Sequence, residues 1–132
     1  MTETLPGGQY RFRFRQRLHG TKQFQAVFSG GINNSRGFIN LHGLPNNLGY
    51  NRLGLSVPRK VGMARTRNRI KRLIRESFRL SQPRWPQGYD VIVVVRPHEV
   101  KTLDAYQQAM LSAIQAIDRK WRQDSHNSDE QI

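Results

Sequence analysis

The sequence predicts a single domain with a mixed α+β fold, in which a small mixed sheet packs with helices. The chain has 132 residues, which is the usual size of one domain. An apolar stripe at helical spacing covers residues 66–79, and residues 90–96, with a continuous apolar run at 91–95, predict a strand buried on both faces. The remaining helix and strand patterns alternate irregularly, which argues against a repeating β-α architecture.

A short helix is expected before the first strands. Phe24, Val27 and Phe28 lie at positions i, i+3 and i+4, so they share one side of that helix. Thr21 precedes them as a candidate N-cap, and Gly30-Gly31 follows as a terminator.

The expected element order is α-β-β-(β)-α-β-α, with one optional strand. Residues 38–44 and 52–57 alternate as strands, and Pro58 ends the second of them. Thr102 is a candidate N-cap for the last helix. The inner side of that helix carries Leu103, Tyr106, Met110, Ile114, Ile117 and Trp121.

The chain is expected to divide into an arm, a domain and a tail. Residues 1–16 form a basic and aromatic N-terminal arm, in which residues 10–15 alternate with period two and are expected to be extended. Residues 17–122 form the domain, and the polar residues 123–132 are expected to fray.

Positive charge is concentrated in the first 79 residues. The whole chain carries 22 Lys and Arg against 9 Asp and Glu, a net charge of +13. Residues 59–79 alone hold nine basic residues and one acid, Glu76. This imbalance argues against a neutral metabolic enzyme and favours a polyanionic partner, because cations on phosphates release condensed counterions.

Several classes of protein are excluded or disfavoured by composition. The chain has no cysteine, so it cannot form a disulfide, a thiolate nucleophile or a zinc knuckle. Its longest apolar run, residues 91–95, is far shorter than the ~20 residues of a membrane span. Because no apolar stretch precedes the basic cluster, no secretory signal is expected, and the predicted location is cytoplasmic.

No catalytic or metal-binding motif stands out. The four histidines lack metal-ligand spacing, the acids form no paired motif, and no glycine-rich phosphate loop is present. Catalysis by this chain alone is therefore not expected.

The segment 65–76 predicts a helix with a cationic ridge opposite its apolar stripe. Asn68, Arg72, Arg75 and Arg79 lie opposite the stripe, and Arg69 and Lys71 flank them. A merely solvated helix normally mixes both signs of charge, but only Glu76 opposes this run. A DNA recognition helix is a further alternative, although such helices usually occur in all-helical domains.

Two aromatic residues on the first helix have two possible roles. Phe24 and Phe28 could be core residues, which is the usual role at helical spacing, or they could be a stacking platform for single-stranded bases.

Four stretches in this order resemble the protein subunit of bacterial ribonuclease P. They are Arg17-Leu18 with Phe24–Phe28, Arg52–Gly62, Arg67–Glu76 and Gly88–Pro97. The resemblance covers roughly residues 17–121, and its longest part is the sequence RNRIKRLIRE, which is similar to the family signature.

The resemblance implies an α+β fold with a left-handed β-α-β crossover, of the kind shared with a domain of a ribosomal protein. It implies two RNA partners, the ribonuclease P RNA subunit and precursor tRNA, and no DNA or membrane partner. The RNA subunit, with Mg²⁺ bound to RNA rather than to a protein site, would remove the 5′ leader of the tRNA.

The resemblance also implies roles for individual residues. A leader-binding cleft would be formed by Phe24, Phe28, Ser56, Arg59 and Lys60. The surface facing the RNA subunit would be formed by Arg65, Arg67, Asn68, Arg69, Lys71, Arg72 and Arg75. No catalytic residue and no metal ligand is expected.

Two other hypotheses fit the same charge pattern. A ribosomal protein or a general RNA chaperone would use a similar cationic face, but would not prefer precursor over mature tRNA. Binding to an anionic membrane would require the Ile70–Phe78 stripe to be exposed rather than buried.

Overall fold

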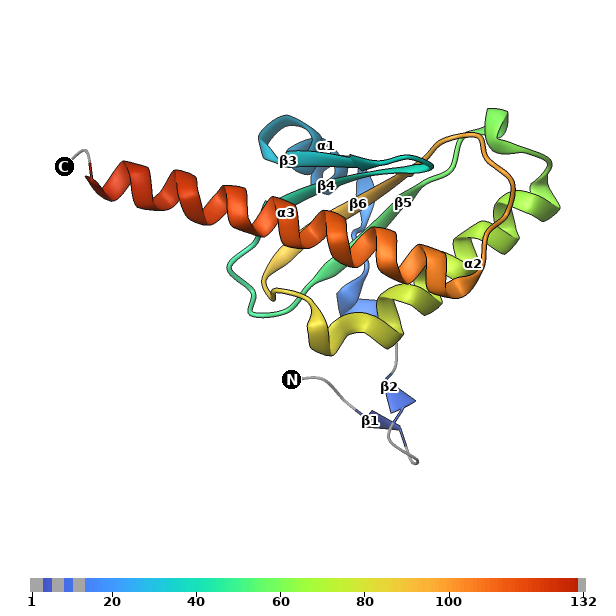
Figure 1. Cartoon of the computed structure of the whole chain (residues 1–132), viewed down its shortest axis with the longest axis horizontal. Helices are drawn as coiled ribbons and strands as arrows, with labels where there is room; N and C mark the ends of the chain where they lie inside the picture. Colours follow the sequence, from blue (N-terminus) through green and yellow to red (C-terminus); the bar gives the residue numbers. More distant parts are fainter. Residues whose placement is uncertain (1–3, 6–8, 11–13, 131–132) are drawn as a thin grey trace.

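The computed structural model describes residues 4–5, 9–10 and 14–130, and it confirms the predicted α+β fold (Figure 1). Its helices are α1 (Gly20–Gly30), α2 (Ala64–Ser81) and α3 (Leu103–Glu130). Its main sheet has the strand order β3-β4-β6-β5. The bounds are β3 Ile32–Arg36, β4 Ile39–Pro45, β5 Arg52–Ser56 and β6 Tyr89–Val95.

The chain crosses from β5 to β6 through α2. These two strands are parallel neighbours, while β6 is antiparallel to β4 and β4 is antiparallel to β3. In Figure 1, α3 passes in front of the sheet and α2, which covers the same face, runs below it, while β6 lies to the left of β5 along their common direction. This is a left-handed crossover, a hand found in only a few per cent of such connections.

Strand β6 is buried on both of its faces. Val91, Val93 and Val95 face the main core, where α2 and α3 cover the sheet. Ile92 lies on the opposite face in a smaller cluster with Leu18 and Val27, and α1 covers that cluster. A strand buried on both faces requires a continuous apolar sequence, so the run at residues 90–96 predicted it correctly.

The apolar stripe of α2 is confirmed as core. Ile70, Ile74 and Phe78 are fully buried, and Leu73 packs against them. The helix is longer than the predicted 66–79 by two residues at each end. Thr102 also acts as predicted, because its Oγ1 accepts a hydrogen bond from the Ala105 N–H at 3.2 Å in the first turn of α3.

Three strands of the main sheet precede α2, as the expected order allows, but the additional strand is β3, which lies before residues 38–44 where none was expected, and it forms a hairpin with β4. Arg36 pairs with Ile39 across a two-residue turn, and Gly37 holds a φ of +66° at the first turn position. A glycine at that position is typical of a type II′ turn. The sequence Ile-Asn-Asn-Ser-Arg is mostly polar because β3 is an edge strand, which explains why periodicity did not predict this strand.

The N-terminal segment differs from the prediction in two places. The N-cap of α1 is His19 rather than Thr21, and the His19 main-chain N–H donates to Gln23 Oε1 at 2.5 Å. Residues 14–16 form a 3-10 turn, so an extended conformation through Arg15 is wrong. Within the arm, β1 (Thr4–Leu5) pairs with β2 (Gln9–Tyr10), and residues 11–13 lie outside the described chain.

At the other end, α3 continues to Glu130, through most of the predicted tail. Its outer half projects past the sheet (Figure 1). No helix in the described part of the chain is both long and apolar enough to cross a membrane.

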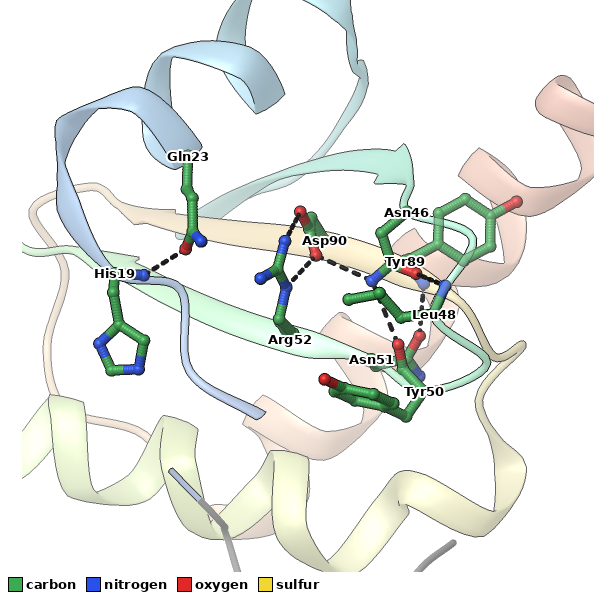
Figure 2. Close-up of polar contacts among 9 residues, drawn as sticks. All are labelled: His19, Gln23, Asn46, Leu48, Tyr50, Asn51, Arg52, Tyr89 and Asp90. Carbon is green, nitrogen blue, oxygen red and sulfur yellow. Dashed lines mark hydrogen bonds and ion pairs between the residues drawn. The ribbon is translucent and has the colours of Figure 1, made fainter. Parts of the chain in front are cut away.

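A polar network joins the loop after β4 to the start of β6 (Figure 2). Asn51 is fully buried; its Oδ1 accepts the Tyr89 N–H at 2.8 Å and its Nδ2 donates to the Pro86 carbonyl at 3.0 Å. Arg52 donates through two nitrogens to Asp90, at 2.8 and 2.7 Å. These side-chain contacts fix the geometry of the loop after β4 and join it to the start of β6.

Replacing Asn51→Ala should lower the free energy of unfolding by about 2–4 kcal/mol, because it leaves the buried Tyr89 N–H and the half-buried Pro86 carbonyl without these partners. Urea denaturation monitored by circular dichroism measures this change. Asn33→Ala, at an exposed position of β3, is the control and should change stability by less than about 0.5 kcal/mol. Equal stability of the two variants would contradict the structural role of Asn51.

Candidate nucleic-acid interface

Most of the predicted cationic residues of α2 lie on the side of the helix away from its buried stripe, but Arg67, seven residues before Ile74, lies on the same side as the stripe. Exposed side chains are those of Arg65, Asn68, Arg69, Arg72 and Arg75, whereas Arg67 and Lys71 are half-buried. Arg67 Nε donates to the Gly62 carbonyl at 3.2 Å, so this side chain also fixes the turn before the helix. The other predicted residues are available on the surface.

Glu76, the one acid of this segment, neutralises little of the positive charge on the ridge. Glu76 accepts hydrogen bonds from Arg79, one of them at 3.1 Å from Nε, and this contact lowers the pKa of the Glu76 carboxyl. A cavity of about 400 Å³ opens along the same face. Its lining comprises Asn68, Lys71, Arg72, Arg75, Glu76 and Arg79.

Three cations from two segments converge on a second cavity, of about 220 Å³. Arg17, from the segment before α1, meets Lys71 and Arg75 of α2 beside strand β5. Arg17 and Leu53 form a parallel bridge, and the Leu18 N–H donates to the Leu53 carbonyl at 3.0 Å, which fixes the approach of this segment. Burial and then the positive charge of Arg17 lower the pKa of Arg75.

Phe24 forms the apolar wall of this second cavity. It is half-buried, and Gly54 on β5 lies beneath it. A Cβ atom at position 54 would lie 2.7 Å from Phe24 Cζ, so only glycine allows this close approach. Phe24 is therefore partly core and partly cavity wall, and its role in stacking on bases stays a prediction.

Phe28 lies further along α1 in a different environment. Its side chain is 45% exposed, and its ring meets His42 edge to face at a centroid distance of 4.9 Å. Asn40 Nδ2 lies 3.2 Å from His42 Nε2, and burial lowers the pKa of His42. Phe28 is thus a surface aromatic residue whose ring packs against the partly buried His42, and it is not a core residue.

The remaining predicted cleft residues lie at the end of β5. Ser56 is half-buried on the sheet face that α1 covers, and it pairs in register with Val94. Arg59 and Lys60 are exposed on the 3-10 turn η2 (Arg59–Val61) that follows. None of these three lines the cavity beside Phe24.

The structure therefore brings together part of the predicted site and adds residues to it. Phe24, Lys71 and Arg75 share one cavity, whereas Phe28 does not line it. Arg17, Gly54, Asn40 and His42 were not predicted as site residues. Arg17 precedes a predicted helix in a basic run, but its approach to α2 depends on a bridge to β5 that periodicity does not reveal.

Among the described residues, no group of three or more His, Asp or Glu side chains is placed to hold a metal ion. The cationic cavities instead suit anionic groups, because arginine and lysine donate to phosphate oxygens with charge-assisted hydrogen bonds.

Comparison with known sequences gives the family. The sequence model described as Ribonuclease P matches residues 12–118. A "Ribonuclease P protein component" of Caldanaerobacter subterraneus subsp. tengcongensis is 45% identical over 80 residues, which are 61% of this chain and 69% of the relative. One of Buchnera aphidicola subsp. Schizaphis graminum is 49% identical over 92 residues, 69% of this chain and 80% of the relative.

Solved structures show the same similarity. The ribonuclease P protein of Thermotoga maritima superposes with a TM-score of 0.69 at 29% identity, over 80% of this chain and 97% of that protein. The Staphylococcus aureus protein gives a TM-score of 0.68 at 28% identity, over 76% of this chain and 94% of that protein. With a family match that spans the sheet, α1 and α2, the chain belongs to the ribonuclease P protein component family.

Proposed function

We propose that this chain is the RNA-binding, non-catalytic subunit of ribonuclease P and assists removal of the 5′ leader from precursor tRNA. The observation that carries the proposal is the cationic ridge of α2, which the single acid Glu76 does not neutralise. Such a surface is stable beside a polyanion and repels itself without one.

The ridge is assigned to the ribonuclease P RNA subunit. Its exposed side chains are mostly arginines, whose planar guanidinium groups can donate two hydrogen bonds to one phosphate. They lie on a helix that is fixed by three fully buried side chains, so the spacing of the charges is preorganised.

The cleft beside α1 is assigned to the precursor leader. Arg17, Lys71 and Arg75 surround a cavity that accepts phosphate, while Phe24 forms its wall and the exposed Phe28 offers a ring to an unpaired base. Ser56, Arg59 and Lys60 would extend this path beyond the cavity. Aromatic and cationic side chains side by side are the usual way to bind single strands.

The chemistry is assigned to RNA. The Mg²⁺ that hydrolysis requires would be bound by RNA phosphates, in a cytoplasmic complex. The protein would position the substrate and screen phosphate repulsion, so that the complex works at lower magnesium concentration.

Cleavage of precursor tRNA at low magnesium tests the proposal. A bacterial ribonuclease P RNA, this protein, and their mixture are compared, and only the mixture should release the leader. Cleavage by the protein alone would overturn the assignment of the chemistry to RNA. If the protein binds RNA tightly but the mixture does not cleave precursor tRNA, the result would favour a ribosomal protein or an RNA chaperone.

Arg72→Ala should weaken binding to the ribonuclease P RNA and reduce the slope of log K against log salt by about 0.7–0.9, the effect of one lost phosphate contact. Filter binding between 50 and 200 mM salt measures this slope. Arg119→Ala removes the same charge from an exposed position of α3 and should leave the slope unchanged. The assignment of the α2 ridge is wrong if Arg72→Ala and wild type have the same slope.

Phe28→Ala should weaken binding of precursor tRNA by a factor of about 5–150, because base–aromatic stacking contributes roughly 1–3 kcal/mol. Binding of mature tRNA, which has no leader, should change less than about twofold, and the ratio of the two affinities is the measurement. Leu48→Ala, at a residue 43% exposed, is the control for loss of surface apolar area. Equal losses for precursor and mature tRNA would contradict a role in leader binding.

A further inference from the structure

A cavity of about 510 Å³ has no part in the proposed RNA and leader surfaces. Its walls come from the β4–β5 loop, the turn before β6 and the outer half of α3, and none of its lining residues belongs to α1 or α2. Trp121 and Arg122, which line it, lie beyond the residues that match the family. Its volume is within the range of small-ligand sites.

One wall of this cavity is a fixed guanidinium. Tyr89 is buried, and its hydroxyl donates to Asp118 Oδ1 at 2.7 Å. Asp118 Oδ2 in turn accepts from Arg122 Nε at 2.9 Å. Burial and this hydrogen bond raise the pKa of Tyr89, so the hydroxyl remains a donor at neutral pH. Arg122 is thus held through Nε while its side chain is 76% exposed, which leaves both terminal nitrogens to face an anion.

The adjacent wall is a fixed aromatic ring. Trp121 Nε1 donates to the Gly43 carbonyl at 3.0 Å, which sets the orientation of the indole, and the residue remains half-buried at the cavity edge. The indole packs in part against the core, and the part that lines the cavity can stack on a flat ligand.

The loop that closes the cavity is preformed. The Asn46 N–H donates to the Gly88 carbonyl at 2.8 Å, and Asn46 Nδ2 donates to Asp90 Oδ1 at 2.8 Å. Asn46 Oδ1 accepts the Leu48 N–H at 2.9 Å, and Figure 2 shows the contacts of Asn46 with Leu48 and Asp90. A ligand that enters this cavity would therefore not need to order the loop, which lowers the cost of binding.

We infer that this cavity binds one unpaired nucleotide of a bound RNA, with the base on Trp121 and the phosphate on Arg122. An aromatic face next to a guanidinium is the combination that recognises a base and its phosphate together. The RNA partner follows from the proposed function, but the cavity is built from other elements, so the two can be tested separately.

Adenosine 5′-monophosphate is the probe, and the indole N–H signal of Trp121 in nuclear magnetic resonance spectra is the reporter. The nucleotide should shift this signal in a saturable manner, and adenosine or inorganic phosphate should bind more weakly. Trp85 is buried, packs against Phe78 and does not line the cavity, so its indole signal should not move. Absence of a Trp121 shift with the nucleotide would overturn the inference.

Two variants that each lose one positive charge are compared for nucleotide binding. Arg122→Ala should weaken nucleotide binding about 5- to 10-fold, whereas Arg119→Ala, exposed on the same helix but outside the cavity, should change it less than twofold. Both should keep the wild-type melting temperature within a few degrees, because both side chains are exposed. Equal nucleotide affinity of the two variants would overturn the assignment of Arg122.

Binding to a bacterial ribonuclease P RNA separates this inference from the proposed function. Arg122→Ala should lose three- to tenfold in RNA affinity relative to Arg119→Ala, and equal affinities would overturn the RNA contact. If wild type binds no such RNA but the nucleotide still shifts Trp121, the proposed function fails and the nucleotide site stands. A shift caused by tetraglutamate but not by the nucleotide would assign the cavity to an acidic protein partner and overturn the inference.

Discussion

Burial of the α2 stripe is the interaction on which the rest of the structure depends. Four like-charge pairs spaced i,i+4 lie along this helix, Arg65–Arg69, Arg67–Lys71, Lys71–Arg75 and Arg75–Arg79. At about 0.2–0.5 kcal/mol each, their repulsion totals about 1–2 kcal/mol. Burying Ile70, Ile74 and Phe78 contributes about 1.5–3 kcal/mol per side chain and outweighs that repulsion. The core thus holds a helix whose charges would otherwise oppose its formation.

Strand β6 connects this helix to the other face of the sheet. Its odd-numbered valines pack under α2 and α3, while Ile92 packs under α1 beside Val27. Gly54 lies next to Ile92 in the parallel register and leaves room for Phe24. A change in the register of β6 would therefore disturb the cationic ridge and the aromatic residues of α1 together, although neither lies on β6.

The features predicted correctly from sequence are those with strong local periodicity or a local cap. The α2 stripe, the apolar run of β6 and the Thr102 cap are all of this kind. The edge strand β3 has too few apolar residues to show alternation, and the cap of α1 uses a main-chain donor of His19 that side-chain preferences do not indicate. The meeting of Arg17 with Arg75 depends on a bridge to β5, which is a tertiary contact with no sequence period.

Three acids in the described part of the chain each orient one arginine, and they do not neutralise the cationic surface. Asp90 holds Arg52 on the sheet, Glu76 holds Arg79 at the end of α2, and Asp118 holds Arg122 on α3. Each of these pairs fixes one guanidinium, and none involves Arg65, Arg69 or Arg72. The excess positive charge of the sequence is therefore concentrated on the exposed side of α2 in the folded protein. Arg122, which is held by Asp118, lies apart from it beside Trp121 on α3. Under the proposed function, a long RNA that follows the positive charge of α2 would contact both surfaces, whereas a small anion would occupy only one of them.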